Sequence, residues 1–167
     1  MAKESVVIDR PPLYVSSNWS DSVQIAAAGA LTGLGVWLLT FLLQQFILNP
    51  VFCRTTDTAS ICDNGLTIAF GVATVAMAAI SVALLARLDV FRPLLVSVAA
   101  AVTLWNLPAH LHGIQLFGAG IEQLIWTVVL YGLLFVLFAW LLRLRQFAVS
   151  LILMVLVVAL MRWVVIS

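Results

Sequence analysis

The sequence predicts an all-helical integral membrane protein, and three observations support that fold class. Hydrophobic residues make up 64% of the 167 residues and charged residues only 9%, whereas soluble domains carry about 25% charged residues. The few charges are spaced so that they separate long uncharged segments. These segments are continuously apolar, unlike the alternating strands of about 10 residues that build membrane β-barrels. We therefore expect helices that cross a lipid bilayer within one membrane domain.

The uncharged segments predict five transmembrane helices. A helix needs about 20 apolar residues to cross, because each residue adds about 1.5 Å and the hydrocarbon layer is about 30 Å thick. Four segments reach that length, and the last one reaches it if Arg145 and Arg162 at its two ends extend to the interfaces. The predicted helices cover about 22–48, 65–86, 93–114, 120–142 and 146–165. Residues 21–167 would then form a single transmembrane domain, and residues 1–20 a tail before it.

The distribution of lysine and arginine predicts how these helices are oriented. In a five-helix topology, Arg54 and Arg162 lie on one side of the membrane. The other side carries the remaining basic residues, which are Lys3, Arg10, Arg87, Arg92, Arg143 and Arg145. Because cytoplasmic loops are enriched in lysine and arginine, we expect a cytoplasmic N-terminus and an external C-terminus. The expected location is the cell membrane, meaning a plasma membrane or a bacterial inner membrane.

Both cysteines of the chain, Cys53 and Cys62, fall in the loop after the first predicted helix. The orientation places that loop outside, where disulfides persist. We therefore predict a Cys53–Cys62 disulfide, which would contribute about 2–3 kcal/mol; two free thiols are the alternative. The spacing is not that of a thioredoxin-type CxxC pair, and the loop has no histidine to complete a zinc site.

Small residues predict where the helices contact one another, because lipid provides no hydrophobic driving force for helix association. Gly29 and Gly33 form a GxxxG pattern that suits packing within the chain or, as an alternative, a dimer. A second packed face follows from residues that recur at helical spacing in the second helix, which are Thr67, Gly71, Thr74, Ala78 and Ser81.

The fourth predicted helix carries large aromatic side chains. We expect them to face lipid or to lie in the interfacial belts. They are Trp126, Tyr131, Phe135, Phe138 and Trp140.

Polar residues gather where the third predicted helix meets the fourth. Thr103, Asn106 and His110 share one helix face, and Glu122 begins the next helix on the same outer side. One interpretation is the hydrated end of a helical hairpin, in which the helix dipole stabilises Glu122. The other is a polar site for a proton, a cation or another ligand, because ionisable groups in membrane domains commonly serve function. Pro108 lies within this segment and predicts a kink or an end of the third helix.

The sequence contains no nucleotide-binding loop, GxSxG or HExxH motif, so we expect no enzyme activity, no catalytic residue, no cofactor and no metal site. A net charge of +1 gives no electrostatic basis for binding nucleic acid. The sequence favours a small multi-pass membrane protein with a structural or accessory role. Its partners would be the lipid bilayer and other membrane-protein subunits. The alternative is a small transporter or channel that uses the polar residues at the outer end of the third and fourth helices.

Overall fold

The computed structural model of the chain describes residues 19–52, 65–90, 92–105, 119–144 and 146–166. All of its elements are helices, which confirms the predicted all-helical class. The predicted tail begins outside the described residues, and the first helix starts at Trp19. In chain order the elements are α1 (Trp19–Leu43), the π-helix η1 (Gln44–Phe52) that continues it, α3 (Gly65–Arg87), α4 (Pro93–Thr103), α6 (Ala119–Leu142) and α7 (Phe147–Ile166).

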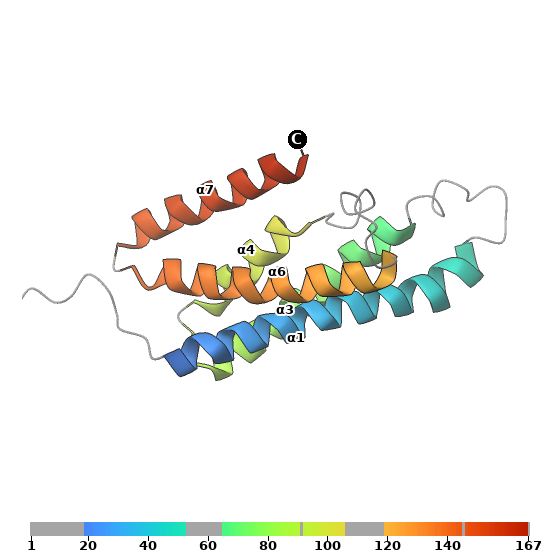
Figure 1. Ribbon diagram of the computed structural model, residues 1–167, viewed down its shortest axis with the longest axis horizontal. Coiled ribbons are helices and arrows are strands. Elements are labelled where there is room, and N and C mark those ends of the chain that lie inside the picture. The colour runs from blue at the N-terminus through green and yellow to red at the C-terminus, as the bar shows by residue number, and fades with distance from the viewer. Residues whose placement is uncertain (1–18, 53–64, 91, 106–118, 145, 167) are drawn as a thin grey trace, which may run out of the picture.

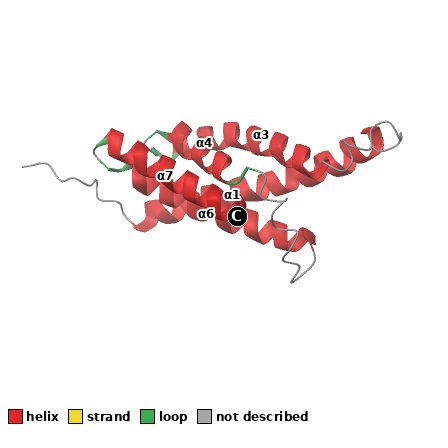
Figure 2. Ribbon diagram, turned by 90° about the horizontal axis from the view of Figure 1, so that it is seen from above, coloured by secondary structure: helices red, strands yellow, loops and turns green. Residues whose placement is uncertain are grey.

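The helices lie side by side along one long axis and alternate in direction (Figures 1 and 2). Helices α1, α4 and α7 run one way, and α3 and α6 run the other (Figure 1). The start of α1 and the connections around Arg92 and Arg143 therefore share one end, which we call the basic end. The opposite end contains η1 and the first turn of α6 with Glu122, and we call it the Glu122 end.

Three helices are long and apolar enough to cross a membrane, which are Trp19–Pro50, Gly65–Arg87 and Ile121–Leu142. Two shorter apolar helices accompany them, Pro93–Thr103 and Phe147–Trp163. The structure thus shows a membrane protein with three candidate membrane-spanning helices. The predicted number of five stays a prediction.

The third predicted helix, 93–114, differs most from the structure, because α4 ends at Thr103; residues 106–114 lie outside the described residues. The amide groups of Leu104 and Trp105 donate to the carbonyls of Ala100 and Val102 in a closing turn. Pro108 explains this early end, since its ring clashes with the carbonyl of Leu104 in a continuous α-helix and it lacks an N–H. The 11 residues of α4 cover about 16 Å, roughly half of the hydrocarbon thickness.

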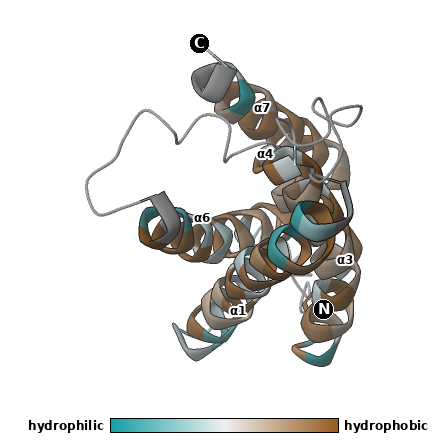
Figure 3. Cartoon of the chain, turned by 90° about the vertical axis from the view of Figure 1, so that its right-hand side faces the viewer, coloured by the Kyte–Doolittle hydropathy of each residue, from teal (hydrophilic) through white to brown (hydrophobic). Residues whose placement is uncertain are grey.

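Helix α1 packs between α6 and α3, and α4 lies against α3, α6 and α7 (Figure 3). The closest approach joins α1 to α6. A Cβ atom built on Gly29 would lie 2.6 Å from the carbonyl oxygen of Tyr131, and one on Gly33 would lie 2.5 Å from that of Thr127. Only glycine therefore lets the two backbones meet here. The GxxxG pattern is used for packing within the chain.

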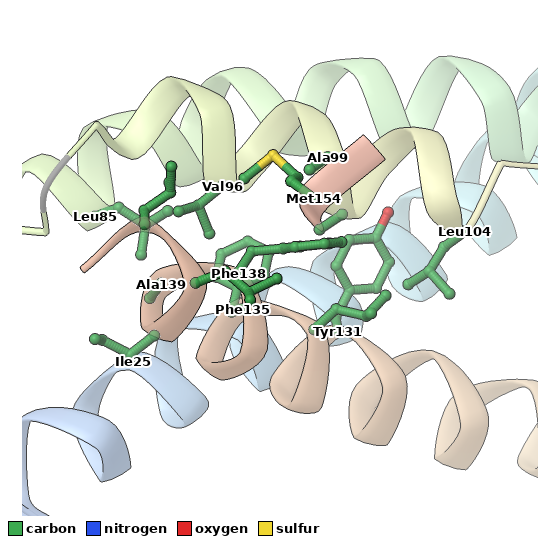
Figure 4. Close-up of a cluster of buried hydrophobic side chains, with 14 of the residues drawn as sticks. Ile25, Leu85, Val96, Ala99, Leu104, Tyr131, Phe135, Phe138, Ala139 and Met154 are labelled. Carbon is green, nitrogen blue, oxygen red and sulfur yellow. The ribbon is translucent and has the colours of Figure 1, made fainter. Parts of the chain in front are cut away.

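The core combines aliphatic with aromatic side chains, and most of the aromatic ones come from α6 (Figure 4). Tyr131, Phe135 and Phe138 are buried, so the expectation that they face lipid was wrong for these three. It holds for Trp126 and Trp140, which are exposed. The three core residues follow one another at steps of four and three, which places them on the single α6 face that turns toward the other helices. Hydropathy could not reveal this, because lipid and protein core select the same side chains.

Helix α7 lies at the periphery of the bundle (Figure 3) and buries few side chains, among them Ser150 and Met154. The hydroxyl of Ser150 donates to the carbonyl of Leu141 at 2.9 Å, which ties the start of α7 to the end of α6. At the same end, the guanidinium of Arg92 stacks over the ring of Phe147 at 3.7 Å, a favourable cation–π arrangement.

Candidate functional site

Two of the four predicted site residues, Thr103 and Glu122, lie within the described structure, whereas Asn106 and His110 lie outside it. Thr103 is the last residue of α4 and is buried, and its hydroxyl donates to the carbonyl of Ala99 at 2.7 Å. Glu122 lies in the first turn of α6 and is only 7% exposed. The grouping of Thr103, Asn106, His110 and Glu122 into one polar site therefore stays a prediction. Cys53 and Cys62 also lie outside the described residues, so their disulfide stays a prediction too.

The end of α4 presents backbone carbonyls that need partners outside the helix, because the last carbonyls of a helix have no partner within it. Helix α7 provides one, because Nη1 of Arg162 donates to the carbonyl oxygen of Trp105 at 2.7 Å. The sequence predicts only that Arg162 extends to the membrane interface, and it does not predict this contact with α4. The sequence gives only a weak signal for this contact. Trp105 follows Pro93, the start of α4, by about as many residues as Arg162 follows Phe147, the start of α7. In two parallel helices the two residues therefore lie at a similar height.

A second polar contact joins α3 to α4 nearer the basic end. Oγ of Ser97 donates to the carbonyl of Ala78 at 2.8 Å, and Oγ of Ser81 lies 2.9 Å from the same oxygen. The two hydroxyls also contact each other. Ala78 and Ser81 belong to the face of small residues that the sequence predicts. Ser97 is the residue of α4 that meets this face.

Three buried polar atoms in the described residues make no hydrogen bond: Oγ1 of Thr74, the hydroxyl oxygen of Tyr131 and Nε2 of Gln123. The Thr74 and Tyr131 hydroxyls come from α3 and α6 and lie close enough to interact, although outside the geometry of a hydrogen bond. Neither Tyr131 nor Gln123 belongs to the predicted site. The sequence pattern that could have identified them is the recurrence of polar side chains at steps of four, at Gln123, Thr127 and Tyr131, which places them on one face of α6.

The interior between this level and the basic end is filled by apolar side chains, which we call the apolar plug. Figure 4 shows it around Phe135 and Phe138. Its members are fully or almost fully buried: Ile25, Leu85, Val96, Phe135, Phe138 and Ala139. The three polar atoms without a hydrogen bond thus lie on the Glu122 side of the plug, whereas the buried hydroxyls nearer the basic end, those of Ser81, Ser97 and Ser150, are bonded to backbone carbonyls. The described part of the plug itself contributes only apolar side chains.

Within the described ranges, no group of three histidine, cysteine, aspartate or glutamate residues is arranged to hold a metal ion. Comparison with family models, curated proteins and solved structures finds no match to this chain. Its function is therefore inferred from its own geometry.

Proposed function

We propose that this chain is a structural or accessory subunit of a membrane assembly in the cell membrane. The observation that supports the proposal most is the apolar plug. A transport route needs polar groups through the whole thickness of the membrane, whereas side chains such as Phe135, Phe138 and Leu85 close the interior near the basic end. The hydroxyls of Ser81 and Ser97 beside the plug are occupied by the carbonyl of Ala78.

The partner would be another membrane protein, because the exposed surface is apolar. Most of α7 beyond Ser150 and Met154 is exposed, and Ile152 and Val155 are each more than 60% exposed. The connection between α3 and α4 at the basic end is a short turn, which offers a soluble partner little surface.

Photocrosslinking in native membranes tests this role. A photoreactive residue at Ile152 should crosslink to one other membrane protein in reproducible stoichiometry, and so identify a subunit. The same photoreactive residue placed at Met154, on the buried face of the same helix, is the matched control and should give no crosslink to another protein. Leu38 on the exposed face of α1 tests the opposite side of the bundle. Crosslinks to lipid alone from both Ile152 and Leu38 would contradict the proposal.

The orientation within this proposal places the basic end in the cytoplasm. Arg87, Arg92 and Arg143 gather at the end where α1 begins, in agreement with the enrichment of basic residues in cytoplasmic loops. In intact cells, a membrane-impermeant reagent should label a cysteine introduced within 54–61 of a variant that lacks Cys53 and Cys62. It should leave Glu4→Cys unlabelled until the membrane is permeabilised. The opposite pattern would reverse the topology.

A small transporter or channel is the second candidate, built on Thr103, Asn106, His110 and Glu122. The observation that favours it is the end of α4 partway across the bundle, since interrupted helices line binding sites in many transporters. Proteoliposomes that contain the purified chain decide between the two functions. A proton or cation flux that Glu122→Gln abolishes would support transport, whereas the accessory role predicts no flux above that of empty liposomes.

A further inference from the structure

The buried hydroxyls of this bundle follow a rule, and Thr74 departs from it. Among the described residues, every other buried serine or threonine hydroxyl lies within hydrogen-bond distance of a backbone carbonyl. These are Thr32, Thr40, Ser81, Ser97, Thr103, Thr127 and Ser150. Threonines in helices usually bond the carbonyl four residues earlier, as Thr32, Thr40 and Thr103 do here. The Thr74 hydroxyl does not, although its side chain is fully buried.

The hydroxyl of Tyr131 on α6 lies next to the hydroxyl of Thr74. Tyr131 is 2% exposed, and its hydroxyl likewise makes no hydrogen bond. Figure 4 shows it pointing away from the α6 axis toward α4, on the side where Ala99 and Leu104 lie. Leu104 directly follows the last residue of α4, so the Tyr131 hydroxyl lies at the level where α4 ends (Figure 4).

The number of protons makes a third partner necessary. The two hydroxyls carry two O–H protons, and a bond from one hydroxyl to the other uses only one of them. The other proton needs an acceptor, and the side chains beside Tyr131 in the core, such as Phe135 and Leu104, have none. Buried polar groups in proteins are paired with other groups or with ordered water.

We propose that Thr74 and Tyr131 bind one water molecule inside the bundle, at the level where α4 ends. A water oxygen has two lone pairs and can accept a hydrogen bond from each of the two hydroxyls, which gives both O–H protons an acceptor and gives the water the two partners that buried water requires at least. Neither hydroxyl brings a charge to the site, which suits a neutral guest such as water. This site is independent of the role in an assembly proposed above, and its test needs no activity.

X-ray radiolytic footprinting of the full-length protein in nanodiscs tests the site. Radiolysis of a bound water releases a hydroxyl radical beside its ligands, so a buried side chain is oxidised only where ordered water lies against it. Tyr131 should be oxidised in spite of its burial. Phe135 and Phe138 in the dry plug should stay protected, with each rate compared with the rate of the same residue in the unfolded chain.

Three variants make the test specific. Thr74→Val keeps the shape of the side chain and should lower the oxidation of Tyr131 several-fold. Thr74→Ser restores the hydroxyl and should restore the oxidation. Thr32→Val, which removes a buried hydroxyl already bonded to the Ala28 carbonyl, should leave it unchanged. Protection of Tyr131 equal to that of Phe138 in the wild-type protein, or equal oxidation in the wild-type protein and folded Thr74→Val, would overturn the proposal.

Discussion

Arg162 and Trp105 connect the ends of two parallel helices, through a hydrogen bond of 2.7 Å from the guanidinium to the backbone carbonyl. The bond brings a cation from α7 to the C-terminal end of α4, where the helix dipole favours positive charge. Helix α7 buries few side chains. Its position therefore depends on few contacts, and the bond of Ser150 to Leu141 near the start of the helix is another of them.

Arg162→Ala should loosen α7. The lost bond is charge-assisted, but the group is exposed, so we expect the free energy of unfolding to fall by about 1 kcal/mol, below the usual value for a charged hydrogen bond. Arg162→Lys should retain part of the stability. Unfolding of the purified protein in SDS, followed by circular dichroism, measures both. Equal midpoints for the wild-type protein and Arg162→Ala would show that the bond adds no stability.

Gly33→Ala should destabilise the α1–α6 interface. The added Cβ would lie 2.5 Å from the carbonyl oxygen of Thr127, and a backbone atom cannot yield without moving the helix. Overpacking of this kind costs typically about 1–3 kcal/mol, which the same SDS titration measures. Gly71→Ala is the matched control, because its Cβ would lie 3.5 Å from the ring of Trp105, an ordinary contact. A Gly33→Ala variant as stable as Gly71→Ala would contradict the close approach of α1 to α6.

Ser97→Ala should weaken the contact between α3 and α4. The hydroxyl of Ser97 donates across the helix interface to the carbonyl of Ala78, and hydrogen bonds between membrane helices contribute about 0.6 kcal/mol on average. Ser81→Ala should cost less, because the Ser97 bond remains. A double-mutant cycle measures the coupling of the two hydroxyls, and additive effects would show that they act separately.

The disulfide prediction concerns residues outside the described structure and has its own test. Mass spectrometry under non-reducing conditions should find the peptide that contains Cys53 and Cys62 lighter than its reduced form by two hydrogen atoms. The physical reason is the external position expected for this loop, where thiols oxidise. Free thiols in protein taken directly from cells would contradict the disulfide.

The sequence by itself determined the class of this protein, because an uncharged segment of sufficient length has few stable states other than a helix in a membrane. It also placed most helix boundaries close to their observed positions, since charges and prolines end such segments. Gly29 and Gly33 indicated that α1 packs closely against another helix, but the sequence did not identify that helix as α6.

Only the tertiary structure decided which faces are inside. Lipid and protein core select the same apolar side chains, so the burial of Tyr131, Phe135 and Phe138 was invisible to hydropathy. The meeting of Arg162 with Trp105, and of Thr74 with Tyr131, joins residues 57 positions apart in each case. Local periodicity carries no information about such pairs, because they depend on which helices become neighbours and at what height.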